Sequence, residues 1–102
     1  MSGWFGVRCV FRDLNNEVYE ERITLWQASD AAQAIALAEE EAVEYAAVFD
    51  NTSYVGLAQS FELSDLPVHG GEVFSLMRDS ELAPNEYLST FFSTGAERVG
   101  DL

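Results

Sequence analysis

The chain carries few of the side chains that catalyse reactions or bind metal ions. It has one cysteine, Cys9, and one histidine, His69. A protein zinc site needs several ligands drawn mainly from these two residue types, and a serine or cysteine nucleophile needs a base such as histidine beside it. Cys9 alternates with apolar residues, which is typical of a buried strand position. His69 precedes two glycines, which is typical of an exposed loop. We therefore expect no metal, no cofactor and no catalytic residue.

Four glutamates cluster in an alanine-rich segment that is expected to be helical. They are Glu39, Glu40, Glu41 and Glu44. Consecutive residues of a helix point about 100° apart, so the first three cannot converge on one metal ion or substrate atom. Glu40 and Glu44 are four residues apart and share one helix face. This acidic face is either simply solvated or a docking surface for a basic protein.

A second group of candidates lies near the N-terminus. It comprises two tryptophans and three arginines: Trp4, Arg8, Arg12, Arg22 and Trp26. Residues 4–12 and 17–27 are expected to be strands because apolar residues recur at every second position, and residues 13–16 have the composition of a turn. Whether the candidates come together depends on how these two strands pair.

Two registers differ in what they place beside the apolar face of the first strand. In one register, the numbers of paired residues add up to 31, and that face lies beside polar residues: Glu20, Arg22 and Thr24. In the other register, the numbers add up to 30, so that Phe5 lies beside Leu25 and Val7 beside Ile23. A shift by one residue turns every side chain to the opposite face. We predict the second register, because it places apolar side chains next to one another.

In the predicted register, Trp4 lies opposite Trp26 and Arg8 opposite Arg22, on the face that points away from the core, with Arg12 further along it. Three interpretations of this surface stay open. In the first, the C-terminal helix or loops cover it. In the second, it is the interface of a homodimer, because Trp and Arg are enriched in interface cores and most small oligomers are two-fold. In the third, it binds a small anion between the arginines, beside the indoles.

Residues 30–49 are expected to form a long amphipathic helix. Asp30 and Ser29 are equally good N-caps, and Asp30 with Gln33 three residues later resembles a capping box. Apolar residues recur at spacings of three and four, which is the pattern of a helix with one buried face. This stripe consists of Ala31, Ile35, Ala38, Ala42, Tyr45 and Phe49.

The rest of the chain completes the predicted fold. Residues 54–63 and 72–77 are predicted strands, and Pro84 is expected to open a second helix. The resulting order is β-β-α-β-β-α. We therefore expect an α+β fold with a four-stranded, mainly antiparallel sheet and one long amphipathic helix on one face. A short C-terminal helix is expected at an edge of the sheet or on its other face.

The composition bounds the class of protein. The chain has 102 residues, of which 48% are apolar and 13% aromatic, a balance that supports a buried core and argues against disorder. We expect one domain over residues 1–102, with an ordered core at about 3–94 and a frayed tail at 95–102. The sequence lacks the features of a signal peptide and any apolar run of bilayer length, so we expect a cytoplasmic protein of a bacterial cell.

The charge narrows the choice of partners. Five Lys+Arg against eighteen Asp+Glu give a formal net charge of −13, and all five cations are arginines. Binding to phosphate backbones or to anionic membranes relies on clustered cations. We therefore predict neither nucleic acid nor a membrane as a partner. A basic protein is electrostatically compatible with this chain.

Five segments carry a resemblance to a known family: WFGVR at 4–8, EERITLWQASD at 20–30, the Ala/Glu-rich helix, YVGL at 54–57 and EVFS at 72–75. Over roughly residues 4–92, the chain resembles a family of small bacterial proteins described only as a domain of unknown function. None of these segments is a chemical motif. The resemblance therefore implies one bacterial domain of a common fold and no catalytic residue.

Taken together, these observations predict an acidic, non-catalytic binding module that associates with itself as a homodimer. One alternative is an immunity- or inhibitor-type protein whose acidic surface masks a basic partner that handles nucleic acid. The other alternative is a protein that binds a small anion or small molecule, or an enzyme, which uses the face of Trp4, Arg8, Arg22 and Trp26.

Overall fold

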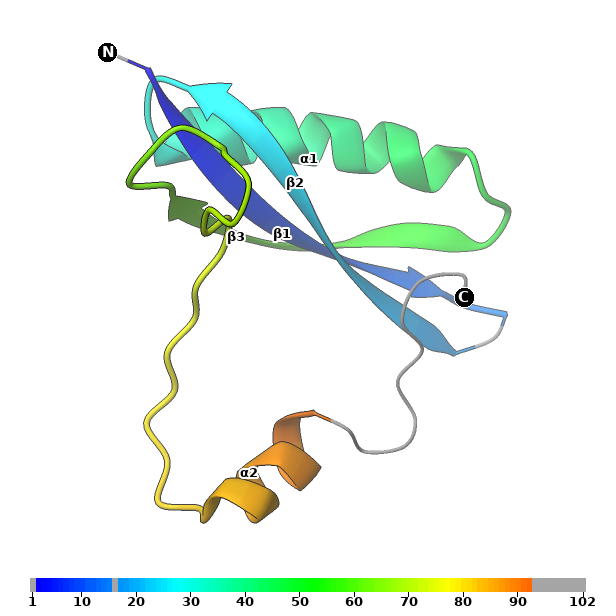
Figure 1. Ribbon diagram of the computed structural model, residues 1–102. Coiled ribbons are helices and arrows are strands. Elements are labelled where there is room, and N and C mark those ends of the chain that lie inside the picture. The colour runs from blue at the N-terminus through cyan, green and yellow to red at the C-terminus, as the bar shows by residue number, and fades with distance from the viewer. Residues whose placement is uncertain (1, 16, 93–102) are drawn as a thin grey trace.

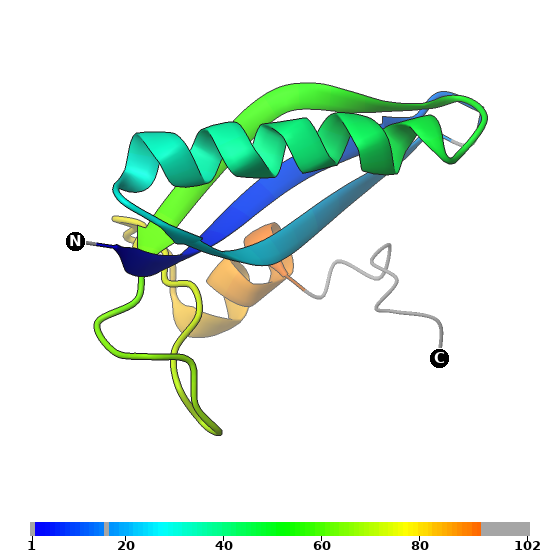
Figure 2. The same cartoon turned by 90° about the horizontal axis from the view of Figure 1, so that it is seen from above.

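The computed structural model describes residues 2–15 and 17–92 and has an α+β fold (Figure 1). Its three strands form one antiparallel sheet in the order β2-β1-β3. Helix α1 covers one face of this sheet, called here the helix face, and helix α2 lies on the opposite side, that of the outer face (Figure 2). The elements are β1 (Gly3–Asp13), β2 (Val18–Ala28), α1 (Ala31–Ala47), β3 (Thr52–Glu62) and α2 (Pro84–Phe91).

The core lies between the central strand β1 and helix α1. Strand β1 contributes Phe5, Val7, Cys9 and Phe11, whose alternation turns all four side chains to the helix face. Helix α1 contributes four alanines spaced by four residues: Ala34, Ala38, Ala42 and Ala46. Alanine side chains are small, so the helix axis approaches the sheet closely. The buried position of Cys9 agrees with its predicted role as a small apolar residue.

The buried stripe of α1 differs from the predicted one at its ends. Ala38 and Ala42 are buried as predicted, and Ile35 and Tyr45 flank them, but Ala31 is exposed. The helix begins with a capping box. The carboxylate of Asp30 accepts a hydrogen bond from the Gln33 backbone N–H (2.8 Å), and the Gln33 side chain accepts one from the Ser29 backbone N–H (2.6 Å).

The predicted register of β1 and β2 is wrong by one residue. Paired residue numbers add up to 31, so that Phe5 lies opposite Trp26 and Cys9 opposite Arg22. The hairpin closes at the pair of Asp13 and Val18 rather than through the predicted three-residue loop. The Asp13 carboxylate accepts a hydrogen bond from the Asn15 backbone N–H (3.0 Å), which stabilises this longer turn.

The predicted fourth strand does not form: residues 72–77 belong to no strand in the described chain. Instead of pairing along a sheet edge, this segment crosses the outer face of β1. The carbonyl of Val73 lies so close to Gly6 that a Cβ at this position would collide with it. Phe74 packs against Phe61 of β3 with ring centroids 6.3 Å apart.

Helix α2 begins at Pro84, as predicted, but it does not pack on the sheet. None of its Cα atoms lies within 8 Å of a Cα in another described helix or strand, and none of its residues is buried. An extended segment separates it from the body of the molecule (Figure 1). The predicted frayed tail, residues 95–102, lies outside the described residues.

Candidate functional site: the outer face and the C-terminal arm

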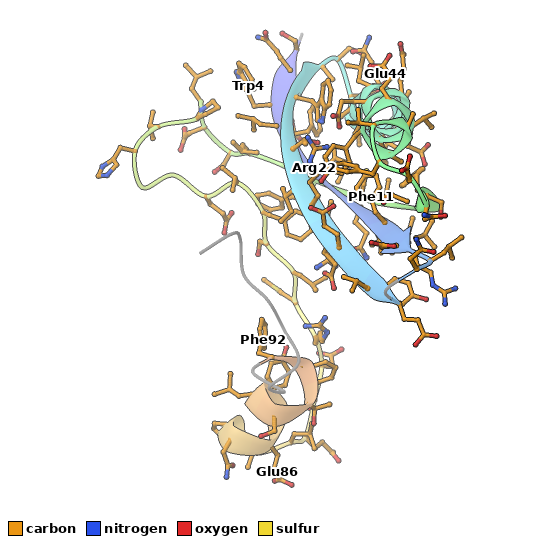
Figure 3. The ribbon with its side chains drawn as sticks, turned by 90° about the vertical axis from the view of Figure 1, so that its right-hand side faces the viewer. Trp4, Phe11, Arg22, Glu44, Glu86 and Phe92 are labelled. Atoms are coloured by element: carbon orange, nitrogen blue, oxygen red, sulfur yellow. The ribbon has the colours of Figure 1, made fainter. Side chains whose placement is uncertain are left out.

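The structure divides the five predicted binding residues between the two faces of the sheet. Trp4, Arg8 and Arg12 lie on the outer face, whereas Arg22 and Trp26 lie on the helix face. Figure 3 shows Trp4 on the side away from α1. Trp4 pairs with Gln27 of β2, and Arg8 pairs with Ile23. The predicted tryptophan pair and arginine pair therefore do not exist.

Arg22 is held between the sheet and α1. It donates a hydrogen bond to Glu41 (2.6 Å) and lies 4.0 Å from the centroid of the Tyr45 ring. The hydrogen bond to Glu41 raises the pKa of the Arg22 guanidinium. Tyr45 in turn donates to Glu20 (2.9 Å), and burial together with this hydrogen bond raises its pKa. Arg22 and Glu20 therefore both have hydrogen-bond partners on α1. These partners explain why a register that places polar residues on the helix face is stable.

Two polar groups, the Cys9 thiol and the Tyr54 hydroxyl, lie beside the core. Burial raises the pKa of the Cys9 thiol, which keeps it in the weakly nucleophilic neutral form. Tyr54 donates a hydrogen bond to Glu39 (2.5 Å), and burial and this bond raise its pKa. His69 lies exposed in the loop after β3. Within residues 2–15 and 17–92, no three His, Cys, Asp or Glu side chains are grouped so as to hold a metal ion.

The acidic face of α1 is narrower than the run of glutamates implies. Glu39 and Glu41 reach back toward the sheet, to Tyr54 and Arg22. Glu40 and Glu44 are exposed. Figure 3 shows Glu44 on α1, on the side of the molecule away from the outer face. The predicted docking residues therefore share an open surface, and two of the four glutamates already have partners.

Arg8 connects the outer face to the chain that follows β3. Its guanidinium donates to the side chain of Gln59 on β3 and to Glu21 on β2 (3.3 Å). The same guanidinium lies 5.1 Å from the centroid of the Phe74 ring. Arg8 is therefore engaged on three sides and acts as an anchor for Phe74.

An open cavity of about 310 Å³ separates Arg8 from helix α2. On its far side, Arg78 donates to the Tyr87 hydroxyl (3.3 Å) and lies 4.5 Å from the centroid of the Phe91 ring. Tyr87 and Phe91 stack with centroids 4.7 Å apart. These contacts tie α2 to the segment that precedes it, and the cavity separates both from the sheet.

The outer face also carries exposed apolar side chains, called here the outer-face patch: Tyr19, Ile23 and Leu25 of β2 with Val55 and Leu57 of β3. Their exposed fractions lie between 42% and 60%. The β1–β3 pairing is irregular beside Val55 and Leu57, at Gly56, which has a positive φ. In the same region, Arg12 lies over the Tyr19 ring, and its buried Nε has no hydrogen-bond partner among the described residues.

Residues 72–92, called here the C-terminal arm, form the other half of the site. The arm contains seven exposed large apolar residues: Val73, Leu76, Met77, Leu82, Leu88, Phe91 and Phe92. Met77 is 92% exposed. The apolar side chains of the arm are therefore exposed in the single chain rather than packed in its core.

The comparison with protein-family models found no match to this chain, and neither did those with curated proteins and with solved structures. The resemblance drawn from the sequence segments therefore stays a prediction. No helix among the described residues has both the length and the apolar composition that crossing a bilayer requires.

Sequence reasoning missed the outer-face patch and the position of the arm. The signal for the patch was present in Tyr19, Ile23 and Leu25, which share one parity of β2. The predicted register assigned that parity to the core. The signal for the arm was the strand-like pattern of residues 72–77, which predicted a pairing partner that the single chain does not supply.

Proposed function

We propose that this chain is a non-catalytic binding module that works as a homodimer through the outer face of its sheet. The observation that carries the proposal is the exposed apolar surface on that side of the molecule. Exposed apolar side chains gathered on one face of a sheet are typical of interaction surfaces. Arginine and aromatic side chains such as Arg8, Arg12 and Tyr19 are typical of interface cores.

The surface area supports an interface of ordinary size. The chain exposes 7664 Å², whereas a compact monomer of this mass exposes about 5,700 Å². The exposed surface therefore exceeds that of a compact monomer by about 1,900 Å². This excess falls to about 600 Å² if the residues outside the described part are assigned the surface of an unfolded chain. Stable interfaces bury about 600–1,000 Å² of each partner. The excess therefore matches or exceeds what one side of a dimer buries.

Light scattering of the purified chain at micromolar concentration tests this proposal. A dimer gives twice the chain mass of 11.3 kDa. A mass of one chain across that range would refute self-association. The substitution Tyr19→Asp in the outer-face patch should shift the mass toward the monomer, because it places a charge in the apolar interface. Because Tyr19 is 60% exposed, this substitution should leave the fold intact.

A second candidate rests on the exposed carboxylates of Glu40 and Glu44 and on the charge of −13. It is an immunity- or inhibitor-type role in which this acidic face of α1 masks a basic, nucleic-acid-handling partner. Capture of such a partner should weaken with rising salt and fail for the variant Glu40→Lys/Glu44→Lys. Capture that is indifferent to both changes would refute this role. The small-anion site predicted between Arg8 and Arg22 is not proposed, because these arginines lie on opposite faces.

A further inference from the structure

We propose that the dimer forms by exchange of arms: the C-terminal arm of each copy packs on the outer-face patch of the other. This inference rests on the proposed homodimer and specifies which surfaces meet. It assigns one occupant to the patch, a second copy of this chain. It also covers apolar side chains of the arm that are exposed in the single chain.

The arm is anchored at its beginning and unsupported beyond it. The backbone N–H of Leu63, which is buried, donates to the carbonyl of Trp4 (2.8 Å). Val73 and Phe74 then pack over Gly6 and Arg8. After Phe74, the chain leaves the sheet, and α2 lies apart from it (Figure 3). The anchored part fixes the direction of the arm, while the remainder is directed away from its own core.

The arm has the length and the exposed apolar side chains to dock on another molecule. Residues 75–83 span about 30 Å when extended, which is enough to carry α2 beyond its own sheet. Beyond the anchored Phe74, the side chains of Leu76, Met77 and Leu82 are exposed.

Two-fold symmetry satisfies both surfaces at once. Every chain carries one arm and one patch, so two copies bury two arms and two patches in one closed contact. The excess surface of about 600–1,900 Å² per chain is of the size that such a reciprocal contact buries.

The charges of the arm and of the outer face are complementary. The arm carries four acidic side chains, Glu72, Asp79, Glu81 and Glu86, against one arginine, Arg78. The outer face carries Arg8, which is paired with Glu21, and Arg12, which lies over the Tyr19 ring. Two chains that each carry a charge of −13 repel each other, so self-association needs contacts between cations of one chain and carboxylates of the other. A carboxylate from the partner's arm supplies such a contact beside Arg12.

The first test is the dissociation constant of the variant Leu88→Asp, measured by light scattering or sedimentation. Leu88 is 52% exposed on α2, which packs on no other described helix or strand, so the variant should fold normally. We expect the dissociation constant of the dimer to rise at least about tenfold. The matched control is Val43→Asp, at a position 60% exposed on α1, which should leave the dimer unchanged.

The outcomes separate this inference from the proposed function. A wild-type chain that is monomeric refutes the homodimer itself. A wild-type dimer that is unaffected by Leu88→Asp refutes arm exchange and leaves self-association through the outer face in place. If Val43→Asp weakens the dimer as much as Leu88→Asp does, the effect of Leu88→Asp is not specific to the arm, and exchange is likewise refuted.

The second test reads the contact directly. Dimers are assembled from one isotope-labelled and one unlabelled full-length chain, and NMR experiments select contacts between chains. Arm exchange predicts contacts from the Leu88 and Phe91 side chains of one chain to the Ile23 and Leu25 methyl groups of the other. Contacts of these groups within one chain only would show that the arm folds back on its own sheet and would refute the exchange.

Discussion

The contact of Arg22 with Glu41 provides a direct test of the observed register. The two side chains are joined at 2.6 Å and are each about 30% exposed (30% and 31%). Exposed ion pairs contribute about 0.2–1 kcal/mol. The contact of the guanidinium with the Tyr45 ring adds about 0.5–2 kcal/mol. We expect Arg22→Ala to lower the free energy of unfolding by about 1.5–2.5 kcal/mol and Glu41→Ala to lower it by less, because the ring contact remains.

A double-mutant cycle isolates the pair. Urea denaturation of the two single variants and the double variant should give a coupling energy of about 1 kcal/mol between Arg22 and Glu41, reduced by high salt. The same cycle for Arg8 and Glu41 should give a value near zero, since Arg8 lies on the other face. If Arg22 couples to Glu41 no more than Arg8 does, Arg22 does not face α1, and the observed pairing of β1 with β2 is refuted.

Three further predictions concern the core. Ala38→Leu should destabilise the fold by about 1–3 kcal/mol through overpacking, whereas Ala36→Leu on the exposed side of α1 should be nearly neutral in thermal denaturation. The pKa values of Cys9 and Tyr54 are raised in the folded chain above their ordinary values of 9.0 and 10.0. As the pH rises, the unfolded chain therefore loses these protons before the folded chain does. Their contribution to stability is therefore complete below about pH 9 and is lost as the pH rises. In urea titrations between neutral and strongly alkaline pH, Tyr54→Phe should lessen this decline, and an unchanged slope would count against the buried hydroxyl as its source. Trp26→Asp should destabilise the monomer by about 2–4 kcal/mol, because the indole packs against the core; a fully folded variant with weakened association would place Trp26 on the outer face instead.

The sequence was sufficient to predict the elements whose signals are local. Apolar alternation located the first three strands, Asp30 with Gln33 located the start of α1, and Pro84 located the start of α2. Each of these signals acts over a few neighbouring residues. The α+β class follows from their order.

The register and the fourth strand depend on contacts that local patterns do not contain. The rule that apolar strand positions face each other failed because Glu20 and Arg22 find polar partners on α1, at Tyr45 and Glu41. Those partners lie about twenty residues further along the chain. The outward-facing Ile23 and Leu25 also depart from the rule, because both are exposed on the outer face.

Leu63, whose backbone N–H donates to the carbonyl of Trp4, comes before the arm in the sequence. Every residue of the buried core cluster comes before Leu63. During synthesis, the sheet and α1 can therefore consolidate while the last third of the polypeptide is still in the ribosome. Folding then proceeds at a rate independent of concentration. In the proposed homodimer, only the later association of two folded chains would depend on how much of the protein the cell makes.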